Sequence, residues 1–161
     1  MASPIQKILV YVDGSEESIT AAEYAVCLAK TLGAELYALY VVNTRALTDL
    51  VRTRIFLESE EQEYQRDLEQ DAQRYLKHTK EIARNKGLAV EIIQSSGTVH
   101  VIIKEQVKDK DIDLLIIGEL SRIRSRRDEF YNEVERAMRS VGCSVLIVKD
   151  EERVWQLYES L

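Results

Sequence analysis

The sequence has few of the residues that cross-link small proteins covalently or through metal ions. It contains two cysteines, Cys27 and Cys143, and each lies inside an apolar pattern that is typical of a buried thiol. A disulfide framework or a zinc site needs more cysteines, or histidines placed close to them. The sequence therefore predicts reduced thiols and neither kind of cross-link.

Long apolar runs are also missing. No run approaches the roughly 20 residues of a membrane-spanning helix, and the N-terminal segment "MASPIQKILVYVD" lacks the apolar core of a signal peptide. The formal net charge of −6 argues against a general nucleic-acid binder, which usually has a basic surface. These absences predict a cytoplasmic protein that binds neither membranes nor nucleic acid.

Catalytic motifs are equally scarce. The two histidines, His78 and His100, fall on predicted helices with no partner acid or nucleophile evident in the sequence, which favours surface or packing roles. No P-loop, no Gly-x-Ser-x-Gly motif and no metal-ligand spacing is present. We therefore expect no enzymatic activity, no metal and no bound cofactor.

Short β-branched runs and helical segments, by contrast, alternate along the whole chain. The predicted strands cover residues 7–12, 35–42, 89–95, 112–118 and 144–149. A single proline and the absence of a linker favour one domain over residues 1–149, followed by an amphipathic tail over residues 150–161. The alternation predicts an α/β fold, a doubly wound parallel sheet with helices on both faces.

The helices carry recognisable start and stop signals. Ser15 is placed to cap the first helix, Gly33 to end it, and Thr98 to cap the helix after the third strand. From Glu58 to about Lys86 the spacing predicts a long helix with its acids in solvent and one inward face, which consists of Tyr64, Leu68, Ala72, Tyr75, Thr79 and Ile82. Residues 43–57 are compatible with a loop, a short helix or the start of that long helix.

Three segments together resemble a known family. "KILVYVDGSEES", "SGTVHVIIKEQVKDKDIDLLIIG" and "GCSVLIVK", in this order, are similar to the universal stress protein family over residues 6–149. The resemblance implies a five-stranded parallel sheet of the adenine nucleotide alpha hydrolase-like class, in the order 3-2-1-4-5, and a role in stress response. That order would place Asp13 and Gly118 on the two sides of one crevice.

Many members of this family bind ATP through Gly-x-x-Gly, nine residues, then Gly-Ser or Gly-Thr. Mapped on this chain, the first glycine is Gly118, the second position is Ser121, and the final pair falls on Tyr131 and Asn132. Glycines are needed where backbone N–H groups approach the phosphates. The tyrosine would displace a triphosphate, so the chain resembles the subgroup of the family that does not bind ATP.

Two features keep an alternative open. In ATP-binding relatives the acid after the first strand contacts the nucleoside, but Asp13 can equally cap the turn into the first helix. Four arginines, Arg122, Arg124, Arg126 and Arg127, follow Gly118, and guanidinium groups bind phosphate well. They form either a rebuilt anion site, which would make the protein a nucleotide or small-anion sensor, or a solvated loop.

The last strand predicts how the protein assembles. In the implied order "SVLIVK" lies at an edge of the sheet, and an apolar edge strand invites pairing with another chain. The resemblance implies a homodimer through this strand, with Val145 and Ile147 near the two-fold axis. The tail is a second way to cover the same edge, through Val154, Trp155, Leu157 and Tyr158.

Overall fold

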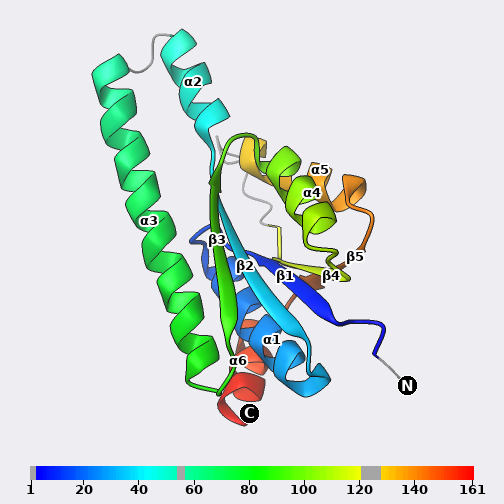
Figure 1. The fold of residues 1–161 in the computed structure, drawn as a ribbon. Coiled ribbons are helices and arrows are strands. Elements are labelled where there is room, and N and C mark those ends of the chain that lie inside the picture. Colours follow the sequence, from blue (N-terminus) through cyan, green and yellow to red (C-terminus); the bar gives the residue numbers. More distant parts are fainter. Residues whose placement is uncertain (1–2, 54–56, 121–127) are drawn as a thin grey trace.

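The computed structural model of the protein describes residues 3–53, 57–120 and 128–161. Strands and helices alternate along these residues, as the sequence predicts (Figure 1). In chain order the elements are β1 (Lys7–Tyr11), α1 (Glu16–Leu32), β2 (Glu35–Val42), α2 (Thr44–Arg52), α3 (Glu58–Arg84), β3 (Val90–Ser96), α4 (Val99–Asp109), β4 (Leu114–Gly118), α5 (Asp128–Ser140), β5 (Ser144–Val148) and α6 (Glu151–Glu159).

The five strands form one parallel sheet in the order β3-β2-β1-β4-β5, which confirms the predicted fold. β1 is central, and it pairs with β2 on one side and with β4 on the other. From β1 the chain first adds β2 and β3 on one side of the sheet, and it then adds β4 and β5 on the other side. The strand order therefore reverses beside β1. Parallel sheets of this kind bind ligands at the carboxyl ends of the strands where the order reverses.

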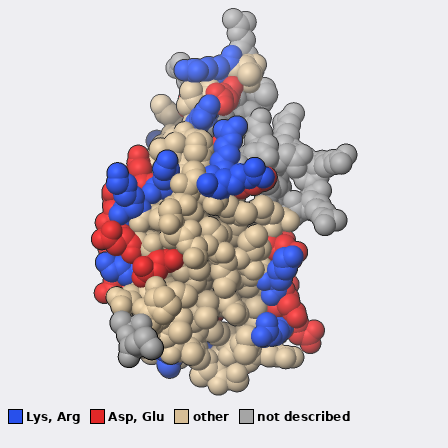
Figure 2. Space-filling model, turned by 90° about the vertical axis from the view of Figure 1, so that its right-hand side faces the viewer, with Lys and Arg blue, Asp and Glu red and all other residues tan. Residues whose placement is uncertain are grey.

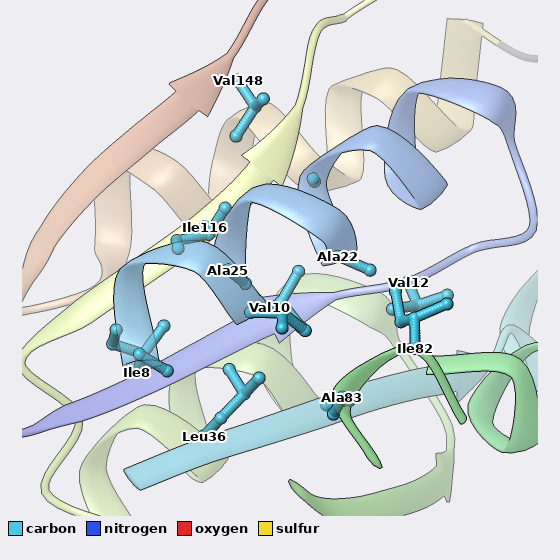
Figure 3. Packing of buried hydrophobic residues seen from close by; sticks show 14 of the residues in the cluster. Ile8, Val10, Val12, Ala22, Ala25, Leu36, Ile82, Ala83, Ile116 and Val148 are labelled. Atoms are coloured by element: carbon cyan, nitrogen blue, oxygen red, sulfur yellow. The ribbon is translucent and has the colours of Figure 1, made fainter. Parts of the chain in front are cut away.

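Each face of the sheet has its own apolar layer, because successive side chains of a strand point to opposite faces. Ile8 and Val10 of β1 pack with α1, α3 and α6 (Figure 3), whereas Leu9 and Tyr11 pack with α4 and α5. All four side chains are buried. The strand sequences are therefore continuous apolar runs, as is usual for a parallel sheet that helices cover on both faces.

The predicted ends of α1 are confirmed. The hydroxyl of Ser15 accepts a hydrogen bond from the backbone N–H of Ser18. This bond satisfies one of the backbone N–H groups that have no partner within the first turn of the helix. Gly33 ends α1 in the left-handed conformation, with φ of 65°, and its N–H donates to the carbonyl of Ala29. Only glycine adopts this conformation at little cost, so the stop signal has a clear physical basis.

The long helix α3 has the predicted extent, but its predicted inward face is wrong at one end. Tyr64 is 45% exposed, and Leu68 and Tyr75 are only partly buried against the core. The N-terminal part of α3 runs alongside α2 beyond the end of the sheet, so the sheet does not lie beneath it (Figure 1). Within the described residues, no helix is both long enough and apolar enough to cross a membrane.

The tail forms α6, which folds back on the same chain and packs mainly on α1. Val154 and Tyr158 join the core, and the Tyr158 hydroxyl donates a hydrogen bond of 2.8 Å to the carbonyl of Ile82 in α3. Trp155 and Leu157 remain 50% and 38% exposed. The apolar side of the predicted amphipathic tail is therefore shared between the core and the surface of its own domain.

Candidate functional site

The candidate site is the crevice at the carboxyl ends of β1 and β4. The two strands are direct neighbours, and they pair in register from Ile8 with Leu114 to Val10 with Ile116. Asp13 follows β1 and Gly118 is the last residue of β4. The sheet thus brings these two predicted site residues to the same edge, at the point where the strand order reverses.

Asp13 shapes the turn between β1 and α1. Its Oδ1 accepts hydrogen bonds from the backbone N–H of Ser15 at 3.0 Å and from the Ser15 hydroxyl at 2.6 Å. The backbone N–H of Asp13 in turn donates to the hydroxyl of Ser18. These bonds form an Asx turn that leads into the helix. Contact of this carboxylate with a nucleoside stays a prediction.

Gly118 lies directly against the backbone of α1. A Cβ atom at this position would come within 2.5 Å of the carbonyl carbon and oxygen of Glu17. Such a distance is far below van der Waals contact, and a helix backbone cannot rotate away as a side chain can. The packing of β4 on the first turn of α1 is therefore enough to require glycine here, whether or not a phosphate binds.

The remaining predicted motif residues fall at or beyond the limit of the described structure. Ser121 and the arginines Arg122, Arg124, Arg126 and Arg127 lie outside the described residues. Tyr131 and Asn132 belong to the first part of α5, which begins at Asp128, but their side chains are not described. The rebuilt anion site around the arginines stays a prediction.

Among the described residues, the charged groups that flank the crevice are mostly acidic. Glu16 and Glu17 form the first turn of α1, next to Asp13, and Glu119 directly follows Gly118. In the part of the chain that the structure describes, the Glu119 carboxylate lies 4.0 Å from the ammonium of Lys149. Acids in a first turn stabilise a helix through its dipole, but here they also place negative charge where a phosphate would have to bind.

A hydrogen-bonded pair that the sequence did not predict joins α4 to α5. Nδ1 of His100 lies 2.5 Å from Oε2 of Glu133, and the backbone N–H of His100 donates to the same oxygen at 3.2 Å. Thr98 occupies the N-cap position of α4 as predicted, but its hydroxyl makes no capping bond. The carboxylate of Glu133 therefore satisfies a free N–H at the start of a neighbouring helix.

The ionisation of Glu133 reflects this position. Partial burial by itself would raise the pKa of the carboxyl group, but the two bonds from His100 and the charge of Arg136 outweigh it and lower the pKa. The pair was not foreseen because residues 100 and 133 are far apart in the sequence. The only signal was a histidine in the first turn of one helix and an acid in another helix of the same layer.

An aromatic wall lies beside the turn at Asp13. Tyr40 of β2 and Tyr75 of α3 stack with their ring centroids 6.5 Å apart, and a Cβ on Gly14 would come within 2.6 Å of the Tyr75 ring. Burial, followed by the charges of Asp71 and Asp13, raises the pKa of Tyr40 to about 12. The sequence placed Tyr75 on an inward face but gave no sign that it contacts the turn after β1.

Comparison with known proteins decides the family. A profile described as the Universal stress protein family matches residues 4–149. The chain belongs to the universal stress protein family. It is 31% identical over 150 residues to Universal stress protein YxiE of Bacillus subtilis, an alignment that covers 89% of this chain and 98% of that protein.

Other relatives agree with this assignment. Universal stress protein MJ0531 of Methanocaldococcus jannaschii is 28% identical over 148 residues, which cover 92% of this chain and 84% of that protein. The solved structure of a universal stress protein from Lactobacillus plantarum has the same fold, with a TM-score of 0.70 at 22% identity, over 91% of this chain and 99% of that one. The family resemblance seen in the sequence is thus confirmed over nearly the whole chain.

Proposed function

We propose that this universal stress protein acts in a stress response without catalysing a reaction, and that it does not hold ATP as the Gly-x-x-Gly motif would. The main support for the proposal is the close contact of Gly118 with the backbone of Glu17. Gly118 is the one motif position that holds a glycine in this chain, and this contact explains the glycine by packing alone. The other glycine positions of the motif hold Ser121 and Tyr131. Neither residue lets the backbone approach a phosphate as glycine does.

Electrostatics supports the same proposal. Among the described residues, four acids lie next to the crevice, Asp13, Glu16, Glu17 and Glu119, and a triphosphate carries several negative charges of its own. Like charges at short distance oppose binding, most strongly where water is partly excluded. A cation such as Mg²⁺ could offset some of this charge, so the binding test includes it.

The polar groups near the crevice also fit a structural role. The His100–Glu133 pair joins two helices, and the Asp13 carboxylate caps a turn. Among the described residues, no three His, Cys, Asp or Glu side chains gather where they could hold a metal ion. These arrangements support packing functions for the residues that a hydrolase would need for proton transfer or metal binding.

The test of weak ATP binding is a calorimetric titration with ATP and AMP, with and without Mg²⁺. We expect no saturable binding at micromolar nucleotide for the unmodified protein. The triple variant Ser121→Gly, Tyr131→Gly, Asn132→Ser restores the motif, and its ATP affinity should rise at least about tenfold, which corresponds to ~1.4 kcal/mol. Circular dichroism checks that this variant folds, since glycine in a helix costs about 1 kcal/mol.

A matched control separates the bulk of the tyrosine ring from the other changes. The triple variant Ser121→Gly, Tyr131→Phe, Asn132→Ser keeps the ring and should bind ATP no better than the unmodified protein. Micromolar affinity of the unmodified protein for ATP would contradict the proposal. An equal gain in both triple variants would show that the ring is not what prevents binding.

A further inference from the structure

A hollow on the layer of α1, α3 and α6 is lined by none of the residues described above for the crevice. Its volume is about 290 Å³, and its walls include Glu23 of α1, His78 and Asn85 from the C-terminal part of α3, and Trp155 and Tyr158 of α6. This volume suits a ligand of amino-acid size rather than a nucleotide. The hollow exists because α6 folds back on α1, beside the end of α3.

One wall of the hollow is a fixed aromatic surface. The rings of Trp155 and Tyr158 stack with centroids 5.8 Å apart, and Tyr158 is held in the core through its bond to the Ile82 carbonyl. Lys86 also lines the hollow, and its ammonium lies 4.7 Å from the centre of the Tyr158 ring, which shows that a cation is accommodated on this aromatic wall. Trp155, at 50% exposure, keeps ring surface open to solvent.

The hollow also contains a carboxylate that has no partner among the described residues. Among the described residues, no hydrogen-bond donor or salt-bridge cation lies within reach of Glu23, which is half-buried. Burial, followed by the charges of Glu151 and Glu159, raises the pKa of Glu23. An ionised carboxylate in this position is destabilised by lost hydration and by like charges, and an incoming cation would relieve both effects.

We propose that this hollow binds a small organic cation that carries a guanidinium group. The planar group would stack on the open face of Trp155 and donate paired hydrogen bonds to the Glu23 carboxylate, a geometry that a rounded ammonium group matches less well. The imidazole of His78 and the amide of Asn85 line the same hollow and can accept further hydrogen bonds. This inference is independent of the function proposed for the crevice.

The chain carries its own reporter, because Trp155 is the only tryptophan. The fluorescence of the full-length protein is titrated with ethylguanidinium chloride at constant ionic strength. The comparison probes are ethylammonium chloride, which keeps the charge, and N-ethylurea, which keeps the planar shape without the charge. We expect a saturable change of the emission with ethylguanidinium, a weaker one with ethylammonium and none with N-ethylurea.

Variants assign the effect to the hollow. Glu23→Gln should weaken ethylguanidinium binding about tenfold, which corresponds to ~1.4 kcal/mol. The matched control Glu105→Gln removes the same charge from an exposed position on α4 and should leave binding unchanged. Trp155→Leu, followed by calorimetry, tests the aromatic wall without the reporter and should also weaken binding.

Three results would overturn the proposal. They are a linear response without saturation, an equal loss in Glu23→Gln and Glu105→Gln, and equal affinity for ethylammonium or N-ethylurea. Circular dichroism at the highest probe concentration excludes unfolding by guanidinium as the cause of a fluorescence change. If Glu23→Gln fails to fold, the calorimetric comparison of Trp155→Leu with the unmodified protein decides alone.

Discussion

At the residue scale, contacts within the chain are enough to explain why Gly118 and Asp13 occupy their positions. Gly118 lets β4 meet the first turn of α1 at Glu17, and Asp13 holds the turn that starts this helix. Both contacts lie within the chain itself. The presence of the first motif glycine and of the acid after β1 is therefore poor evidence for ATP binding, whereas the loss of glycine at position 131 bears directly on it.

The substitution Gly118→Ala should destabilise the fold even in the absence of any ligand. The added methyl group would lie 2.5 Å from the Glu17 backbone, and overpacking of this kind costs about 1–3 kcal/mol. The control is Gly142→Ala, where nothing lies within 4 Å of the added atom and the glycine is not in a left-handed conformation. Urea unfolding of the two variants measures the difference.

Gly142→Ala should stay within about 0.5 kcal/mol of the unmodified protein. Equal stability of Gly118→Ala and Gly142→Ala would show that β4 and α1 can separate slightly at no cost. In that case the glycine at the end of β4 would need another explanation, and a phosphate ligand would be the first one to test.

At the scale of elements, α3 divides into a part that packs on the sheet and a part that runs beside α2. Ala72, Leu76, Thr79 and Ala83 are buried, whereas Tyr64, about two turns nearer the N-terminus than Ala72, is 45% exposed. The buried positions follow the spacing of three and four residues of an amphipathic helix. The helix continues beyond the sheet because its own sequence favours helix, not because the core requires it.

Leu76→Ala should therefore cost much more than Leu68→Ala. Leu76 is 2% exposed within the core, and truncation of such a leucine costs about 2–5 kcal/mol, including the cavity that it leaves. Leu68 is only partly buried at the border of the same layer, so its truncation should cost less than half as much. Urea unfolding midpoints of the two variants compare them directly, and equal costs would contradict the division of α3.

The sequence predicted these elements well where the local signal and the core agree. The spans of β1, β2, α1 and α3 follow from apolar runs, the Ser15 cap and the Gly33 stop. Residues 43–57 gave no clear pattern, and the structure places there the short helix α2, which packs mostly on α3. Tyr64 was misplaced for a related reason, since periodicity alone does not tell where the sheet beneath a helix ends.

The candidate site was less predictable than the fold. The strand order implied by the family resemblance placed Asp13 and Gly118 together, and the structure confirms that their strands are neighbours. The His100–Glu133 bond and the contact of Tyr75 with Gly14 each join residues that are distant in the sequence. Such pairs depend on how two helices pack on the sheet, and one sequence contains no direct signal for that.

At the scale of the whole molecule, the two edges of the sheet offer different surfaces. The side that carries α4, α5 and β5 in Figure 1 has a broad central area without charged residues, with lysines, arginines and acids around it (Figure 2). Ile147 of β5 is 39% exposed at this edge. At the other edge, Ile92 of β3 has a similar exposure of 41%, but Glu91 and Lys110 form an ion pair beside it.

The packing of α6 bears on how assembly should be tested. Val154 and Tyr158 belong to the core of their own chain, so truncation after Asp150 would expose apolar surface and destabilise the fold. A loss of assembly in the truncated protein could then not be distinguished from a loss of stability. Point substitutions at exposed positions avoid this problem. Ile147 tests the edge strand, and Leu157, at 38% exposure, tests the outer side of α6.

We expect the protein to form a homodimer through β5, because an apolar edge strand with free N–H and carbonyl groups pairs readily with its symmetry mate. Light scattering at micromolar concentration should give twice the chain mass of 18.5 kDa. Ile147→Asp would place two like charges close to the two-fold axis and should yield a monomer. Ile92→Asp makes the same change at the opposite edge and should leave the dimer intact. Dissociation by Leu157→Asp instead would assign the interface to α6, and a monomeric unmodified protein would refute the dimer altogether.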